Sequence, residues 1–140
     1  MKSLHLFIIA VLLSPVCLLY AQDTERALYK VDIPFAFTIE NQRLSSGSYI
    51  IYVVNPDHLW RISSYNHKLN AFFHIRTEPN GGLSETPKLV FHHYPTDYVL
   101  RQIDAGRAGF IASLNTGRRE RELAAYSRPL EVATIAAETE

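Results

Sequence analysis

Large apolar side chains occupy every second position between residues 31 and 39, within the stretch VDIPFAFTIE. Because successive side chains of a β-strand point to opposite faces, this pattern predicts a strand with one apolar face. Residues 49–54, YIIYVV, are apolar at every position, which is typical of a strand covered on both faces. A polar connection that contains Gly47 separates the two stretches. Together they predict a β-hairpin that packs against a core.

Short apolar or alternating stretches continue as far as residue 114. The first hairpin is expected to comprise strands at residues 28–40 and 48–54, and five more strands are expected near residues 58–65, 69–77, 88–94, 98–104 and 108–114. Turn-forming residues separate them, as in Asn55-Pro56-Asp57. About seven short strands at this spacing predict an all-β fold, either an antiparallel β-sandwich or a small closed barrel. Pro34 lacks an N–H, which indicates a sheet edge or a bulge in the first strand.

The periodicity changes after residue 114. Asn115 and Thr116 are candidate helix caps, and residues 117–126 contain good helix formers, with an Arg118–Glu122 pair spaced i,i+4. We therefore expect one short closing helix over residues 117–126. Residues 130–140 carry three Glu and no basic residue. We expect residues 127–140 to form a flexible acidic tail, with a late strand near residues 130–135 as the alternative.

The first 21 residues have the organisation of a secretory signal peptide. Lys2 and His5 precede a purely apolar run at residues 6–13, and Ala21 precedes a polar stretch. Cleavage after Ala21 would leave residues 22–27 as a lead-in to a β domain over residues 28–126. Retention of residues 1–21 as an anchor is the alternative, because Leu19 is larger than a signal peptidase prefers. We expect an exported protein, periplasmic or extracellular, whose mature chain does not span the membrane.

Cysteine use and net charge narrow the possible functions. The chain has one cysteine, Cys17, and cleavage after Ala21 would remove it. The mature chain would then have no disulfide, no thiol nucleophile and no thiolate metal site. Lys and Arg together number 14, as do Asp and Glu, so nothing in the net charge attracts nucleic acid. We expect no nucleic-acid partner, no cofactor and a fold held together by core burial.

Histidine and carboxylate side chains would be the remaining candidates for metal binding and catalysis. His92 and His93 are adjacent on a predicted strand, so they face opposite sides and cannot bind one ion together. No histidine spacing typical of a metal site occurs, and we expect no metal site. The sequence also contains no motif typical of a serine nucleophile and no carboxylate pair that indicates glycoside hydrolysis. The catalytic alternative is a hydrolase or metal-dependent enzyme with a barrel pocket, in which His92, His74 or Arg101 meets a carboxylate.

Aromatic residues and arginines are the candidate binding groups. Aromatic side chains on a sheet face can stack on sugar rings or form a partner surface, and we assign this role to Trp60, Tyr65, Phe72, Tyr94 and Tyr98. The alternative is that both faces of these strands are covered. A second candidate is an anion contact formed by Arg118, Arg119 and Arg121, whose alternative is a solvated helix face. The predicted function is a non-catalytic binding or structural module of the cell envelope, with envelope polysaccharide or another envelope protein as partner.

Four short motifs carry a resemblance to a known group of proteins. They are IPFAF at residues 33–37, LSSGSY at residues 44–49, KLVFH at residues 88–92 and RREREL at residues 118–123. Together they resemble small exported β-rich proteins that are abundant in acidobacterial genomes, although Ser45-Ser46 stands where that group has Pro-Ala. The resemblance implies a signal peptide and a β-rich fold, and it carries no known activity.

Overall fold

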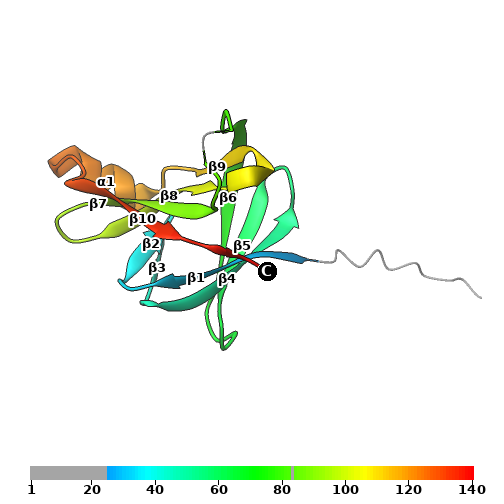
Figure 1. The fold of residues 1–140 in the computed structure, drawn as a ribbon. Coiled ribbons are helices and arrows are strands. Elements are labelled where there is room, and N and C mark those ends of the chain that lie inside the picture. Colours follow the sequence, from blue (N-terminus) through cyan, green and yellow to red (C-terminus); the bar gives the residue numbers. More distant parts are fainter. Residues whose placement is uncertain (1–24, 83) are drawn as a thin grey trace, which may run out of the picture.

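The computed structural model describes residues 25–82 and 84–140, so the predicted signal peptide lies outside the described residues. Within them the chain is mostly β-structure with one α-helix, which confirms the predicted fold class (Figure 1). The elements in chain order are β1 (Arg26–Ile33), β2 (Phe37–Ile39), β3 (Gln42–Leu44), β4 (Gly47–Asn55), β5 (Leu59–Ser64), β6 (Asn70–Pro79), β7 (Lys88–His93), β8 (Tyr98–Asp104), the 3-10 turn η1 (Gly106–Ala108), β9 (Phe110–Leu114), α1 (Arg118–Tyr126), β10 (Glu131–Ala136) and β11 (Glu138–Thr139).

The strands form two layers. Sheet A contains β11, β1, β4, β5 and the first half of β6, and sheet B contains the second half of β6 with β9, β8, β7, β10 and the β2–β3 hairpin. The strand β6 belongs to both layers, because residues 70–74 pair with β5 and residues 75–79 pair with β9. The described part of the chain has 11 strands rather than about seven, and the sheet does not close into a barrel.

The core lies between the two sheets and follows the alternation of the sequence. In β6, Ala71, Phe73 and Ile75 are buried while Phe72 and His74 are exposed, as the alternating pattern predicts. Phe37 joins the layers, because its ring lies 5.4 Å from Tyr49 of sheet A and 5.6 Å from Phe91 of sheet B. These edge-to-face contacts add to the burial of the rings and hold the sheets together.

The first predicted strand is divided at Pro34. Residues 26–33 form β1 in sheet A, whereas residues 37–39 form β2, which pairs with β3 and, in parallel, with β8 of sheet B. Pro34 has no N–H to contribute to a ladder, and it lies where the chain leaves one layer for the other. The expectation of one strand over residues 28–40 is therefore wrong, although the proline marked the irregular position.

The predicted flexible tail contains two strands, β10 and β11, and the first of them agrees with the alternative of a late strand near residues 130–135. The strand β10 pairs antiparallel with β7 along its whole length, and β11 pairs with β1 on the opposite sheet. Between them lies Ala137, which is buried and donates its N–H to Pro87 O at 2.9 Å. Figure 1 shows this last segment running from beside α1 to the C-terminus near β1. The chain end thus covers the edge of sheet B at β7 and the edge of sheet A at β1. This pairing satisfies backbone N–H and C=O groups that an open edge would leave unpaired.

The closing helix α1 forms within one residue of its predicted start, but the cap differs. Its N-cap is Gly117, and the N–H of Arg118 donates to Asn41 Oδ1 at 2.7 Å. A Cβ at Gly117 would lie only 2.0 Å from Glu40 O, so the helix sits directly against the turn after β2. The expected caps, Asn115 and Thr116, are exposed and make no cap hydrogen bond.

Candidate functional site

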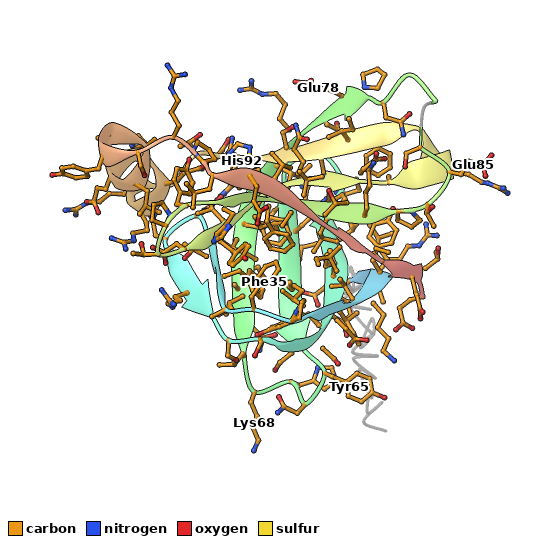
Figure 2. The ribbon with its side chains drawn as sticks, turned by 60° about the vertical axis from the view of Figure 1, so that its left-hand side comes forward. Phe35, Tyr65, Lys68, Glu78, Glu85 and His92 are labelled. Atoms are coloured by element: carbon orange, nitrogen blue, oxygen red, sulfur yellow. The ribbon has the colours of Figure 1, made fainter. Side chains whose placement is uncertain are left out.

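The outer face of sheet A carries the most exposed aromatic side chains of the strands. Phe72 points outward from β6, and Tyr65 follows the end of β5; they are 56% and 61% exposed. The register places Tyr52 opposite Arg61, and Arg61 opposite Phe72, in one row across β4, β5 and β6. Figure 2 shows Tyr65 at the end of the molecule that lies away from His92. We call the residues Lys30, Tyr52, Arg61, Tyr65, Asn70 and Phe72 the aromatic face.

Two cations lie over the rings of the aromatic face. The guanidinium carbon of Arg61 is 4.3 Å from the centre of the Tyr52 ring, and Lys30 Nζ is 5.3 Å from that of Tyr65. Nη1 of Arg61 donates to Asn70 Oδ1 at 2.7 Å, and Glu25 forms an ion pair with its other terminal nitrogen. The face therefore combines ring surfaces with side chains that can hydrogen-bond to hydroxyl groups, and it offers them on an open sheet rather than in a pocket.

The other three predicted ligand residues lie elsewhere. Trp60 is buried, with its ring 6.5 Å from Phe73 and 6.2 Å from Phe110. Tyr94 is buried beside α1. Tyr98 is half-buried and stacks between Phe35 and His93 at 3.8 and 4.0 Å. The structure therefore brings Tyr65 and Phe72 to one open face and does not bring the five aromatic residues together.

The three predicted anion-contact arginines each have a partner within the protein. Arg118 pairs with Glu122 at 2.9 Å, Arg119 pairs with Asp97 at 2.8 Å, and Arg121 donates to Thr116 O at 2.9 Å. They point to different partners and do not converge on one site. Arg119 connects α1 to the β7–β8 turn, whereas Arg118 bonds within the helix and Arg121 bonds to the residues just before it.

The carboxylate of Asp97 links the β7–β8 turn to β3 and to α1. It is buried in the turn between β7 and β8, with Arg43 of β3 at 2.7 Å and Arg119 of α1 at 2.8 Å. Burial alone would raise the pKa of Asp97. Hydrogen bonds from Thr96 and Arg119, with the positive charges of Arg119 and Arg43, outweigh burial and lower this pKa below its usual value.

A second buried carboxylate, Glu120, anchors α1 to β7 and β8. Its Oε1 accepts from the Tyr94 hydroxyl at 3.1 Å and lies 3.4 Å from His92 Nδ1, and its Oε2 accepts from Arg101 at 3.0 Å. Burial, followed by the charge and hydrogen bond of Glu120, raises the pKa of Tyr94 to about 12. His92 and Arg101 therefore meet a carboxylate, as the catalytic alternative required. His74 does not join them, because it lies 3.6 Å from Glu40.

Sequence reasoning missed both Glu120 and a cleft at one end of the sandwich. Glu120 lies between arginines, and this charge pattern indicated a solvated helix face. The cleft has a volume of about 470 Å³, and its mostly apolar lining includes Leu28, Val53, Val54, Trp60 and Phe110, with Arg26 as a charged residue. No local motif marks it, because its walls come from strands that are distant in sequence.

Within residues 25–82 and 84–140, no group of three or more His, Cys, Asp or Glu side chains is placed to hold a metal ion. No helix in these same residues has the length and apolar character needed to cross a membrane. Comparison with protein-family models, curated proteins and solved structures finds no match to this chain. The motif resemblance to small exported proteins therefore stays a prediction.

Proposed function

We propose that this chain is an exported, non-catalytic binding domain of the cell envelope that holds polysaccharide on its aromatic face. The observation that carries the proposal is the exposure of Tyr65 and Phe72 on the same sheet face as the Tyr52–Arg61 stack. Large aromatic side chains left in water on a sheet face favour contact with a ligand or partner. Export rests on the organisation of residues 1–21.

The chemistry of the aromatic face suits a sugar chain. A sugar ring has an apolar face of C–H groups, which stacks on aromatic rings, and a rim of hydroxyls, which needs donors and acceptors. Tyr65 and Phe72 supply the rings, while Arg61 and Asn70 supply hydrogen-bonding groups beside them. An open face can also bind the middle of a long polysaccharide, because no end of the sugar chain has to enter a pocket. A protein partner would use the same rings, so the test must separate the two.

The test measures co-sedimentation of the purified chain with isolated, protein-free envelope polysaccharide. We expect saturable binding that weakens roughly 10- to 100-fold in the Tyr65→Ala/Phe72→Ala double variant, because each ring contributes about 0.5–1.5 kcal/mol beyond its area. The matched control is Tyr126→Ala, since Tyr126 is 92% exposed on α1, away from the aromatic face. Equal weakening by the control, or absence of wild-type binding, would contradict the proposal. Co-sedimentation that occurs only when envelope proteins are left in the polysaccharide preparation would favour the protein alternative.

The second candidate function is a hydrolase that uses His92 with Glu120. It is favoured by the approach of His92 Nδ1 to within 3.4 Å of the carboxylate. Against it, both oxygens of Glu120 already accept hydrogen bonds, from Tyr94 and Arg101. An enzyme would hydrolyse chromogenic esters or glycosides and lose that activity in Glu120→Gln. The binding-domain proposal expects no turnover by the wild-type chain and only a loss of stability, of about 2 kcal/mol, in the variant.

A further inference from the structure

Three residues from neighbouring strands of sheet A stand in one row at the end of the sandwich. Arg26 of β1 pairs with Val53 of β4, and Val53 pairs with Trp60 of β5. Paired residues of antiparallel strands point to the same face of a sheet, so the row faces the inner side with Trp60. Neighbouring strands lie about 4.8 Å apart, which separates Arg26 from Trp60 by roughly 10 Å of sheet. All three residues line the cleft of about 470 Å³.

The row supplies one exposed cation, Arg26, and one buried donor, Trp60 Nε1. Among the residues that the structure describes, Arg26 takes part in no ion pair, and Trp60 Nε1 is buried without a hydrogen-bond partner. Trp60 is only 2% exposed, so bulk water does not satisfy this N–H. Because Nε1 has almost no exposed surface, a ligand in the cleft does not reach it either, and the charged group that the cleft offers is Arg26. The remaining wall of the cleft, which includes Leu28, Val54 and Phe110, is apolar.

We propose that this cleft binds one amphipathic molecule with a carboxylate head and a medium-length alkyl chain. The carboxylate pairs with the Arg26 guanidinium. The alkyl chain packs against Leu28, Val54 and Phe110. The cleft volume of about 470 Å³ lies within the roughly 300–1,000 Å³ typical of ligand pockets. This site is separate from the aromatic face, which lies on the outer side of the same sheet, and it goes beyond the proposed function.

Trp60 makes the test direct, because it is the only tryptophan in the chain. The chain is produced with its own N-terminal segment, purified in the form that the host releases and freed of bound lipid on a hydrophobic resin. Trp60 fluorescence is then titrated with hexanoate, octanoate and decanoate below their micelle concentrations. We expect a saturable change with one ligand per chain, and a Kd that falls about fourfold for each added methylene until the cleft is full.

Two variants and one control separate the head group from the alkyl chain. Arg26→Gln should weaken decanoate binding about fivefold and leave decanol binding unchanged, because only the carboxylate pairs with the guanidinium. Thr77 is exposed and lines the cleft, so Thr77→Phe should fill the space and abolish binding of both ligands without unfolding the chain. Arg128→Gln removes the same charge from an exposed residue that does not line the cleft, and should change neither affinity.

Three outcomes would overturn the proposal. If Arg26→Gln weakened the binding of decanoate and of decanol equally, the carboxylate would not pair with the Arg26 guanidinium. A fluorescence change that appears only above the micelle concentration would indicate a detergent effect. Absence of any saturable change would contradict binding of such a molecule in the cleft. Binding of polysaccharide by the aromatic face is measured separately, so each proposal can fail alone.

Discussion

Replacing Asp97 with asparagine tests whether this carboxylate joins the β2–β3 hairpin and α1 to the body of sheet B. The side chain of Asp97 is 2% exposed, and its oxygens bind Arg43 and Arg119, whose side chains are 62% and 47% exposed. Exposed ion pairs contribute about 0–1 kcal/mol, whereas breaking a fully buried pair costs about 3–5 kcal/mol. A buried carboxylate with two partly hydrated partners lies between these limits. We therefore expect Asp97→Asn to lower the free energy of unfolding by about 2 kcal/mol at pH 7.

The effect should depend on pH in one direction. The folded-state pKa of Asp97 is lowered from the ordinary value of 3.8. A carboxyl group with a depressed pKa stabilises the folded state above its unfolded pKa and loses that contribution as the pH falls through the folded value. The difference between wild-type and variant should thus be constant above pH 5 and shrink as the pH falls from the unfolded pKa of 3.8 toward the lower pKa of the folded state.

Urea unfolding followed by circular dichroism measures this difference at several pH values. At pH 7 the loss corresponds to a decrease in Tm of roughly 6–12 °C for a domain of this size. Asp57→Asn is the control, because Asp57 is exposed in a turn and should change the free energy by less than about 0.5 kcal/mol. A difference of the same size at pH 7 and pH 2.5 would refute the assignment to the ion pairs. A change at pH 7 no larger than in the control would refute it as well.

Two further predictions concern α1 and the chain end. Gly117→Ala should cost about 3 kcal/mol or more in urea unfolding, because its Cβ would meet Glu40 O at 2.0 Å. Gly81→Ala, where the space is open and only the positive φ resists, should cost about 1 kcal/mol, and equal losses would contradict the packing of α1. Removal of residues 131–140 should abolish the cooperative transition in near-ultraviolet circular dichroism, since it uncovers the edges of β7 and β1. A truncated chain with an unchanged transition would show that β10 and β11 are dispensable.

The fold class was predictable because strand burial follows local alternation. In β6 the sequence pattern and the burial pattern agree residue by residue between Asn70 and Ile75. The three Glu of residues 130–140 indicate a tail, whereas the alternating side chains of β10 favour the alternative of a late strand. The inward positions, Ala133 and Ile135, pack against the core, and their small size gave only a weak signal. The helix cap was not predictable, since Asn41 reaches Arg118 from a distant turn.

The candidate site was less predictable, because exposure depends on which faces other elements cover. Nothing in the local sequence distinguishes Phe72, which is open to solvent, from Trp60, which packs against Phe73 and Phe110. For the arginines of α1, the local sequence likewise does not show whether they are free or paired. Their partners include Asp97, which precedes Arg119 by more than 20 residues, and only the docking of α1 on sheet B brings the two together.

We propose that the aromatic face of sheet A is a binding surface. Backbone amide chemical shifts, measured while soluble oligosaccharide fragments of the envelope polysaccharide are added, test it most directly. We predict saturable shifts confined to residues 50–52, 61–65 and 70–72, and their loss in the Tyr65→Ala/Phe72→Ala variant. Shifts confined to α1 and the β7–β8 turn, or no shifts at saturating ligand, would contradict the claim.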